Sequence, residues 1–503
     1  MNILSLFESN VRKYPCKSFL RYQGRSHTYT QVQDLSRRAA AVLAAQGVKA
    51  GDTVAVMCFN TPGFVVAVLG AWRLNAVVVP VNHKMQAPEV DYILGHSGAK
   101  VGVFDGALAP VIGKLQGRIC ALTTDSAAEG YASFDALVEQ TEGIDGTPPG
   151  ENDVAQILYT SGTTGKPKGC LHSHRNVCLA AITATLALSM TREERTLIAM
   201  PLWHSSPLNN WMMGTLYVGG TAVLLREYHP LHFLQAVQDE KVTLYFGAPV
   251  SYLAPLQMLP NFGDFDLGSI RAWIYGGGPI GAEVAAQLAA AYKSDRFYQV
   301  YGMTETGPVG TTLYPEEQVR KAGSIGRVAL PGVDMRVVRE DGTDAAPGQI
   351  GEIWLKAGST MLGYLNDAQA TAQAFSGDWY RSGDLARLDD EGYLFIVDRT
   401  TDMIITGGEN VYSKEVEDAL SSHPAIQDVA VVGRPHPHWG ETVIAVIVPR
   451  AGQTPEPEAL REYLSTRLAK FKIPREFHVR EVVPRTPTGK VMKHVLRESV
   501  LST

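Results

Sequence analysis

The sequence predicts an α/β protein with a large N-terminal domain, made of two α/β subdomains plus a β-subdomain, and a small α+β C-terminal domain. Three observations predict it. Short β-branched runs alternate with Ala- and Leu-rich stretches over roughly the first 280 residues, closely spaced strands begin near residue 320, and a compact mixture of helices and strands follows residue 412. A length of 503 residues fits about three domain-sized units.

The N-terminal runs have the order of βαβ units, which build parallel sheets. In the first subdomain we expect strands at 53–58, 76–81 and 100–105, with a helix at 63–74. In the second subdomain we expect strands at 196–201, 221–227, 242–249 and 270–278.

The later part of the chain has a different sequence pattern, because its predicted strands are separated only by Gly/Asp turns. We expect strands of a mostly antiparallel β-subdomain at 334–340, 351–357 and 392–398. In the tail, helices at 415–423 and 457–471 flank strands at 428–434 and 441–449. The predicted boundaries are an N-terminal domain at 1–397, a hinge at 398–402 and a C-terminal domain at 403–503.

Composition argues against several classes of function. A formal net charge of -6, without a long Lys/Arg run, leaves no basic surplus for a nucleic-acid backbone. No apolar run approaches the roughly 20 residues of a membrane span, and residues 1–15 predict an amphipathic helix without a signal-peptide core. The five cysteines form no C-x-x-C pair and fit reduced, structural thiols. We therefore expect a cytoplasmic protein that binds no nucleic acid and does not span a membrane.

The stretch YTSGTTGKPKG at 159–169 is a candidate anion-binding loop. It is not a Walker loop, because only two residues separate Gly162 from Gly165-Lys166, and Pro167 offers no hydroxyl. Its glycines permit a close approach of the backbone to a ligand. Hydroxyl donors and positive charge come from Thr160, Ser161, Thr163, Thr164, Lys166 and Lys168. A solvated turn is the simpler alternative, but a turn requires no lysines.

A second glycine pattern, Gly276-Gly278-Gly281, fits the G-x-G-x-x-G of a dinucleotide fold, since it lies between a predicted strand and a predicted helix. Such a fold also needs an acidic residue at the end of the next strand, about 20 positions on. That strand, at 296–302, ends in Tyr301-Gly302. Binding of a nicotinamide cofactor is therefore disfavoured.

Five motifs together resemble one family. YTSGTTGKPKG, YGMTE at 301–305, YRSGD at 380–384, DRTTDMIITGGENVY at 398–412 and PRTPTGKVMK at 484–493 occur in the order and spacing of the adenylate-forming superfamily. The chain resembles its acyl-CoA synthetases, including the fatty-acid-CoA ligases. The resemblance implies an AMP-binding N-terminal domain and a mobile C-terminal lid. It also implies a small carboxylic acid substrate, ATP, Mg²⁺ and coenzyme A, and a two-step reaction through an acyl-adenylate.

The resemblance also assigns a nucleotide site. Lys490 would bridge the carboxylate and the α-phosphate, Thr304 would contact the α-phosphate and Glu305 would hold magnesium. A hydroxyl donor and a hard oxygen ligand suit the last two tasks. The remaining ATP and AMP positions are Thr160, Ser161, Gly162, Thr163, Thr164 and Lys168 around the outer phosphates, Gly276, Gly277, Gly278, Pro279, Tyr301 and Gly302 near the adenine, and Asp384 and Arg399 at the ribose.

Two further sites follow from the resemblance. The acyl pocket would be framed by Trp203, His204, Asn209, Asn210 and Gly277, with His204 also counted among the catalytic residues. The coenzyme A passage would involve Gly407, Gly408, Glu409, Trp439 and Phe471. No Arg or Lys occurs at 201–214 or 247–253, which favours an apolar aliphatic or aryl monocarboxylic acid. Thr401 and Ile473 depart from the family pattern at the hinge and at the coenzyme A site.

Three other activities stay open at this point. A stand-alone adenylation enzyme would load a carrier protein instead of coenzyme A. A non-catalytic adenylate-binding module belongs to another class, and the presence of Thr304, Glu305, Asp384 and Lys490 disfavours it. A luciferase-like oxidation after adenylation is a minor option. A homodimer is also left open.

Overall fold

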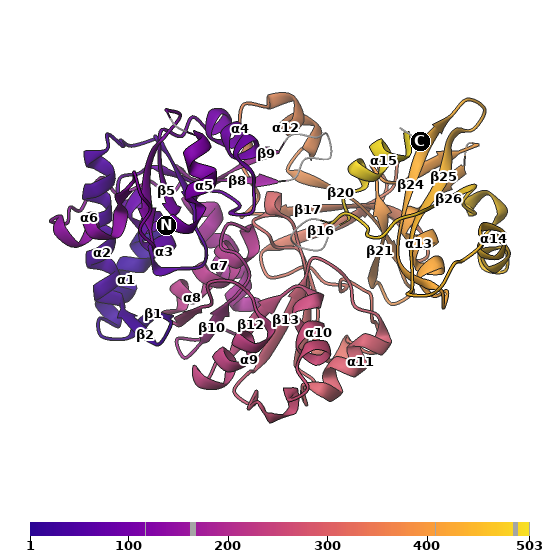
Figure 1. The fold of residues 1–503 in the computed structure, drawn as a ribbon, viewed down its shortest axis with the longest axis horizontal. Coiled ribbons are helices and arrows are strands. Elements are labelled where there is room, and N and C mark those ends of the chain that lie inside the picture. Colours follow the sequence, from indigo (N-terminus) through magenta and orange to yellow (C-terminus); the bar gives the residue numbers. More distant parts are fainter. Residues whose placement is uncertain (116, 161–166, 408, 486–490, 502–503) are drawn as a thin grey trace.

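The computed structural model describes residues 1–503 except 116, 161–166, 408, 486–490 and 502–503 (Figure 1). Of the expected site residues, Ser161, Gly162, Thr163, Thr164, Gly408 and Lys490 lie outside the described residues. The described residues form four sheets. Two large α/β layers, a β-subdomain and a small C-terminal domain follow each other in Figure 1, and this confirms the predicted fold class.

The first large sheet contains the strands expected in the first subdomain. Its order is β18-β9-β8-β4-β3-β5-β6-β7, parallel except where β9 pairs with β8 and β18. The bounds are β3 Thr53–Met57, β4 Val77–Pro80, β5 Val101–Asp105, β6 Cys120–Thr124, β7 Ala132–Ser133, β8 Val154–Thr160, β9 Lys168–Ser173 and β18 Gly363–Tyr364.

The second large sheet has the order β15-β14-β13-β12-β10-β11-β1-β2, with antiparallel pairs only at its two edges. Strand β1, near the N-terminus, pairs in parallel with β11, about 200 residues later. The bounds are β1 Ser18–Tyr22, β2 Arg25–Thr28, β10 Arg195–Ile198, β11 Thr221–Leu224, β12 Leu244–Gly247, β13 Ala272–Gly276, β14 Phe297–Tyr301 and β15 Thr311–Leu313.

Helices separate and cover these two sheets. One buried core joins the facing sides of both sheets through α1 Ile3–Lys13, α2 Tyr29–Ala45, α3 Pro62–Arg73, α6 Phe134–Gln140, α7 His174–Ala187 and α8 Met213–Val218. The outer face of the first sheet packs on α4 Ala87–Ser97 and α5 Ala109–Ile112. The outer face of the second sheet packs on α9 Pro230–Asp239, α10 Pro249–Met258 and α11 Ala282–Ala291. The large domain is therefore layered helix, sheet, helix, sheet, helix.

The predicted β-subdomain is an antiparallel sheet of order β16-β17-β20-β19, in which β21 also pairs with β20. Figure 1 shows it between the large layers and the C-terminal domain. Its elements are β16 Val333–Val338, β17 Ile350–Ala357, α12 Ala368–Ala374, β19 Phe375–Ser376, β20 Trp379–Leu388 and β21 Leu394–Arg399.

The C-terminal domain has a sheet of order β23-β22-β25-β24, with β26 parallel to β25. Helices α13 and α14 cover one face and α15 covers the other. The bounds are β22 Ile404–Thr406, β23 Glu409–Val411, α13 Ser413–Ser421, β24 Ile426–His436, β25 Gly440–Pro449, α14 Pro457–Ser465, β26 Glu476–Val479 and α15 Lys493–Leu501.

Helix α14 ends earlier than its sequence pattern predicts. The expected helix runs to residue 471, but the helix ends at Ser465 and a short 3₁₀ turn, Lys470–Lys472, follows. The hydroxyls of Ser465 and Thr466 donate to the carbonyls of Glu462 and Tyr463. Such local hydrogen bonds from side chain to backbone compete with continuation of a helix.

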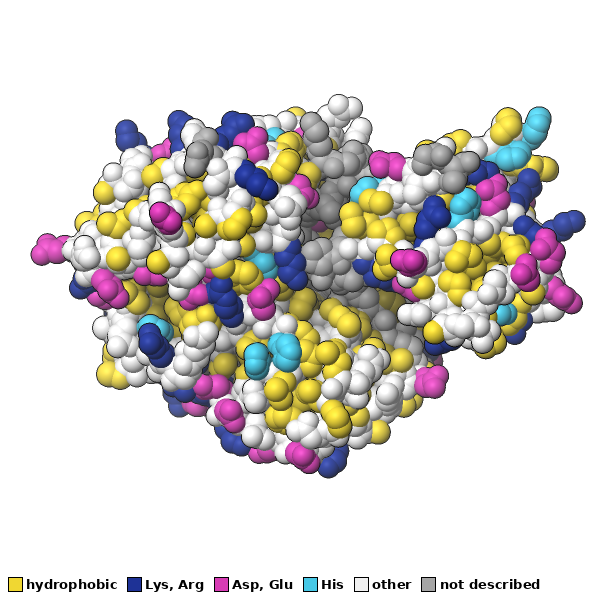
Figure 2. All heavy atoms as spheres, in the orientation of Figure 1, with side chains coloured by type: hydrophobic (Ala, Val, Ile, Leu, Met, Phe, Trp, Pro, Cys, Tyr) yellow, Lys and Arg dark blue, Asp and Glu magenta, His cyan; other side chains and the backbone are white. Residues whose placement is uncertain are grey.

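Figure 2 shows Lys/Arg and Asp/Glu side chains interspersed over one face of the molecule, on the large domain and on the C-terminal domain alike. Within the described ranges, none of the helices combines the length and the apolar character that a bilayer crossing requires.

Candidate active site

A buried carboxylate is the centre of the candidate ribose site. Asp384 on β20 is only 6% exposed, and its register partner on β21 is Arg399. The Arg399 Nε lies 2.9 Å from Asp384 Oδ1, and the Tyr301 hydroxyl donates to Asp384 Oδ2 at 2.8 Å. Burial raises the pKa of the Tyr301 phenol well above its ordinary value, and the Asp384 charge raises it further. Three side chains expected from the sequence therefore meet at one point.

The Thr304-Glu305 pair follows β14 on a short 3₁₀ turn, Thr304–Thr306. A Cβ on Gly302 would lie 2.7 Å from the Pro308 carbonyl oxygen, so only glycine fits before this turn. The Thr304 hydroxyl shares a hydrogen bond of 3.0 Å with Ser205 Oγ. The turn is therefore fixed on the side of the acyl segment.

Glu305 is a partly buried carboxylate that accepts a hydrogen bond from one other side chain among the described residues. The Tyr364 hydroxyl donates to Glu305 Oε1 at 3.1 Å, and no ion pair of the described residues involves Glu305. Burial raises the pKa of its carboxyl above the usual value, because the charged form loses solvation. A bound cation would stabilise the ionised form of such a carboxyl.

The candidate anion-binding loop connects two strands that pair with each other. Thr160 ends β8 and Lys168 begins β9, and the two residues are register partners. The Lys168 ammonium lies 5.1 Å from the centroid of the Tyr364 ring. A Cβ on Gly169 would lie 2.8 Å from the Ile157 side chain, so this loop glycine is required by packing.

The Gly276-Gly277-Gly278-Pro279 segment begins at the last residue of β13, beside the end of β14 that carries Tyr301. A Cβ on Gly276 would lie 3.0 Å from the Val300 carbonyl oxygen, whereas Gly277 has φ +83°. A Cβ on Gly277 or Gly278 would meet no atom within 4 Å. The segment thus presents bare backbone to open space at the carboxyl ends of parallel strands, where α/β proteins bind ligands.

The expected acyl segment forms a π-helix, Ser206–Met212, which is a rare conformation that is frequent at functional sites. Asn209 is fully buried and accepts a hydrogen bond of 2.8 Å from Gln156 Nε2. The Asn210 amide donates to the Pro308 carbonyl at 2.9 Å. Asn209 Nδ2 and Asn210 Oδ1 have no protein partner in the described part of the chain, so each amide keeps one free group.

His204 and Trp203 precede this π-helix, and their ring centroids are 3.7 Å apart. Burial lowers the pKa of the His204 imidazole to about 3, and the nearby His83 contributes to the shift. The ring is therefore neutral at neutral pH. Trp211 stacks on Phe246 with centroids 5.3 Å apart, which adds an apolar wall.

The expected coenzyme A residues lie in the C-terminal domain. Gly407 has φ +61°, and its N–H donates to the Trp439 carbonyl at 2.8 Å. Trp439 and Phe471 are 44% and 40% exposed, unusually open for aromatic side chains, and the Arg475 guanidinium lies 4.9 Å from the Trp439 ring centroid. Glu409 is exposed on β23. The structure thus brings Gly407 and Trp439 together beside a cationic group.

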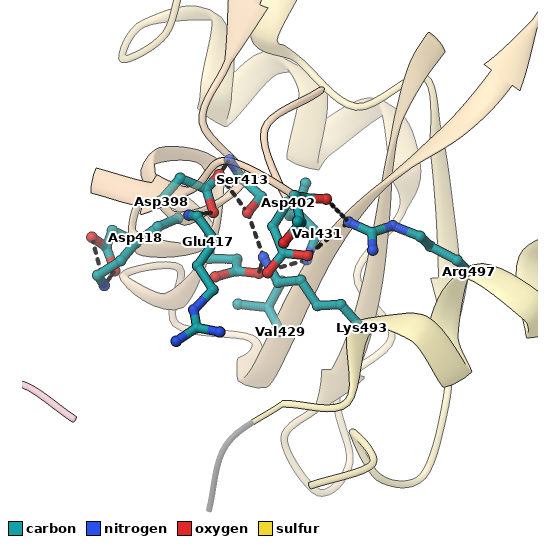
Figure 3. Close-up of polar contacts among 12 residues, drawn as sticks. Asp398, Asp402, Ser413, Glu417, Asp418, Val429, Val431, Lys493 and Arg497 are labelled. Carbon is teal, nitrogen blue, oxygen red and sulfur yellow. Dashed lines mark hydrogen bonds and ion pairs between the residues drawn. The ribbon is translucent and has the colours of Figure 1, made fainter. Parts of the chain in front are cut away.

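The sequence did not predict the contacts among three polar residues near the predicted hinge, although two of them, Asp398 and Lys493, lie at the ends of quoted motifs. Figure 3 shows Ser413 pointing toward Asp398, the penultimate residue of β21, and Lys493 pointing toward Ser413 and Glu417. The Ser413 N–H and hydroxyl donate to Asp398 Oδ2 at 2.5 and 2.8 Å, so Asp398 caps the first turn of α13. The Lys493 ammonium lies 2.9 Å from Glu417 Oε1. The Asp398–Ser413 contacts join β21 of the β-subdomain to α13, whereas the Lys493–Glu417 pair links two helices of the C-terminal domain.

The last helix also contacts the predicted hinge residues. Arg497 on α15 donates to Asp402 Oδ1 at 2.8 Å and to the Thr401 carbonyl at 3.0 Å (Figure 3).

Tyr364 is a further residue that the sequence did not single out. A Gly-Tyr pair in a two-residue strand has no periodicity, so no local signal marks it.

Comparisons with known proteins agree with this geometry. The family described as AMP-binding enzyme matches residues 7–365, and the AMP-binding enzyme C-terminal domain matches residues 415–490. The long-chain-fatty-acid–CoA ligase FadD13 of Mycobacterium tuberculosis is 36% identical over 480 residues, covering 95% of this chain and 93% of its own. A feruloyl-CoA synthase of Amycolatopsis is 34% identical, with coverages of 97% and 96%.

A solved structure is similar over almost the whole length. The o-succinylbenzoate CoA synthetase from Bacillus subtilis, in complex with its acyl-adenylate intermediate, has a TM-score of 0.86 and 30% identity, and the match covers 98% of this chain and 97% of that one. The family resemblance drawn from the five motifs is confirmed. The chain belongs to the AMP-binding enzyme family, as an AMP-forming acyl-CoA ligase that uses ATP and coenzyme A.

Proposed function

We propose that the protein converts an apolar aliphatic or aryl monocarboxylic acid, ATP and coenzyme A into an acyl-CoA, AMP and pyrophosphate. The observation that carries the proposal is the convergence of Tyr301, Asp384 and Arg399 beside the Thr304-Glu305 turn. A buried carboxylate with both oxygens held in place suits two ribose hydroxyls, because each oxygen keeps a lone pair for a further donor.

In the first step, a carboxylate oxygen attacks the α-phosphorus of ATP, and the bond from that phosphorus to the bridging oxygen of pyrophosphate breaks. Both reactants are anions, so the site has to supply positive charge and hydrogen-bond donors. In our proposal Lys168 and Thr160 contact the outer phosphates, and Thr304 donates to the α-phosphate. Lys490, which lies outside the described residues, remains the predicted bridge between the carboxylate and the α-phosphate.

Glu305 fits a magnesium site that is completed by the substrate. Among the described residues no three His, Cys, Asp or Glu side chains gather into a metal-binding group. Mg²⁺ commonly binds through one or two carboxylates together with substrate phosphates, and a partly buried carboxylate with one hydrogen bond matches that pattern. Bound magnesium would neutralise charge on the phosphates.

In the second step, the coenzyme A thiol attacks the carbonyl carbon of the acyl-adenylate, the thiol proton is lost and AMP leaves. Bare backbone at Gly407 and the exposed rings of Trp439 and Phe471 support a passage for the pantetheine and a stacking surface for the adenine. Glu409, beside that passage, and Gly408 are the adjoining positions.

The acyl pocket supports the proposed substrate class. In the proposed pocket, Trp203, Trp211 and Phe246 would supply aromatic surface. His204 is neutral, so residues 201–214 provide no cation to pair with a second substrate carboxylate. The free amide groups of Asn209 and Asn210 are suited to a neutral polar substituent on the acid.

The test is pyrophosphate release from ATP and Mg²⁺ across a panel of aliphatic, aryl and dicarboxylic acids, with AMP and thioester followed with and without coenzyme A. We expect monocarboxylic acids to release pyrophosphate and to form a coenzyme A thioester. Adenylation without acylation of coenzyme A would favour a carrier-protein acceptor. Oxygen consumption would indicate a luciferase-like reaction. No pyrophosphate release with any acid would favour a non-catalytic adenylate-binding module, and a Lys490→Ala protein with full adenylation would contradict the role assigned to Lys490.

A further inference from the structure

Strand β18 carries Tyr364 from the later part of the large domain back to the phosphate-loop strand. In the antiparallel pairing, Tyr364 lies opposite Cys170 of β9. The neighbouring Leu362 and Leu365 N–H groups donate to the carbonyls of Leu171 and Gly169, each at 2.8 Å. The Tyr364 N–H itself donates to Thr371 Oγ1 at 2.9 Å. The backbone at Tyr364 is therefore held in place from both sides.

The Tyr364 side chain contacts the two charged residues assigned to the phosphates and the metal. Its hydroxyl donates to Glu305 Oε1 at 3.1 Å, and the Lys168 ammonium lies 5.1 Å from the ring centroid, within the usual range of a cation–π contact. Neither Lys168 nor Glu305 forms an ion pair with any residue in the described part of the chain. Tyr364 contacts both of them.

A lysine and a glutamate at one partly buried site attract each other strongly, and a direct pair would neutralise both. Such a pair would compete with the phosphates for the lysine and with a cation for the carboxylate. A neutral aromatic side chain that contacts both residues reduces that competition, because its face holds the ammonium and its hydroxyl holds the carboxylate. The two charges then stay oriented and available for a ligand.

We propose that Tyr364 is a positioning residue for magnesium-bound ATP: its hydroxyl orients Glu305, its ring face holds Lys168, and its bulk keeps these two charges from pairing. The inference deepens the proposed function, because it rests on the phosphate role of Lys168 and the magnesium role of Glu305. It concerns binding before the chemical step, so binding measurements test it separately from thioester formation.

The experiment compares Tyr364→Phe and Tyr364→Leu with the parent protein by titration calorimetry with ATP, in the presence and absence of Mg²⁺. Tyr364→Phe keeps the ring face and loses the hydroxyl, so we expect magnesium-bound ATP to bind about tenfold more weakly and metal-free ATP to bind as before. Tyr364→Leu also loses the ring face, so we expect metal-free ATP to bind about fivefold more weakly.

Tyr228→Phe is the matched control. It also removes a tyrosine hydroxyl that makes one hydrogen bond, of 2.6 Å to the Ser251 carbonyl, but at a distance from the site. We expect unchanged ATP binding in this variant, and thermal denaturation of all variants monitors folding. Equal losses in Tyr228→Phe and Tyr364→Phe would overturn the proposal, as would a Tyr364→Phe protein whose affinity gain from Mg²⁺ equals that of the parent.

A double variant tests the separation of the two charges. In Glu305→Gln with Tyr364→Leu, the lysine has no carboxylate to pair with, so we expect binding of metal-free ATP to recover relative to Tyr364→Leu alone. Persistent weak binding would contradict the separating role of the ring. A parent protein that binds magnesium-bound ATP but forms no thioester would instead refute the proposed function, and the same titrations would still decide the role of Tyr364.

Discussion

Replacement of Asp384 by Asn tests the nucleotide site with little change in shape. Asp384 Oδ1 lies 2.9 Å from Arg399 Nε, and Oδ2 accepts from the Tyr301 hydroxyl at 2.8 Å. An Asn amide retains one acceptor oxygen and places an NH₂ where the other oxygen was, facing a donor. One ribose hydroxyl then loses a hydrogen bond to a charged group, and the other binds a neutral acceptor.

The loss of a hydrogen bond to a charged group costs about 1.5–3 kcal/mol. We take about 3 kcal/mol for the combined change, which corresponds to roughly a 100-fold fall in kcat/KM for ATP. The assay is acid-dependent exchange of labelled pyrophosphate into ATP, which reports adenylation without coenzyme A. Asp389→Asn is the control, because Asp389 also pairs with a cation, Lys321 at 2.6 Å, but lies in a turn away from the site. A kcat/KM for ATP that falls no more in Asp384→Asn than in Asp389→Asn would refute the ribose role.

The remaining predictions concern the coenzyme A passage, the acyl segment and the cross-hinge contact. Trp439→Ala removes an exposed ring, so we expect the KM for coenzyme A to rise about fivefold with pyrophosphate exchange unchanged; a matching change in exchange would contradict a coenzyme A role. The pKa of His204 is about 3, so its ring stays neutral between about pH 5 and 8. We therefore expect the pH profile of pyrophosphate release over that range to have the same shape in the parent protein and in His204→Phe. Ser413→Ala removes the hydroxyl bond to Asp398, so we expect a loss of about 1 kcal/mol in urea unfolding, where the exposed Ser422→Ala serves as the control; equal stabilities would show that the contact contributes nothing.

The sequence predicted the positions of strands such as β3 and β13 better than it predicted which strands join each sheet. Runs such as 53–58 and 270–278 are β-branched, apolar and bounded by turn residues, so local pattern was enough to place β3 and β13. The N-terminal strand Ser18–Tyr22 was not placed, because its partner β11 lies about 200 residues away and no local period encodes such a pairing. The early end of α14 depends on hydroxyl bonds at Ser465, which a helical period does not reveal.

The candidate site also contains some residues that local sequence patterns reveal and others that they do not. Tyr301 and Asp384 belong to recognisable motifs, and the structure places them 2.8 Å apart through their side-chain oxygens. Tyr364 and Asp398 act through partners far from them in sequence, so only the folded chain reveals their contacts. The roles of all these residues remain predictions until variants are measured.

The most direct test of the account follows one oxygen atom. A carboxylic acid that supports pyrophosphate release would be supplied with both carboxyl oxygens labelled as oxygen-18, and the products would be analysed by mass spectrometry after one turnover with ATP and coenzyme A. Attack of the carboxylate on the α-phosphorus transfers one labelled oxygen into AMP, and we expect the label there with none in pyrophosphate. Unlabelled AMP, or label in pyrophosphate or free phosphate, would contradict the acyl-adenylate route.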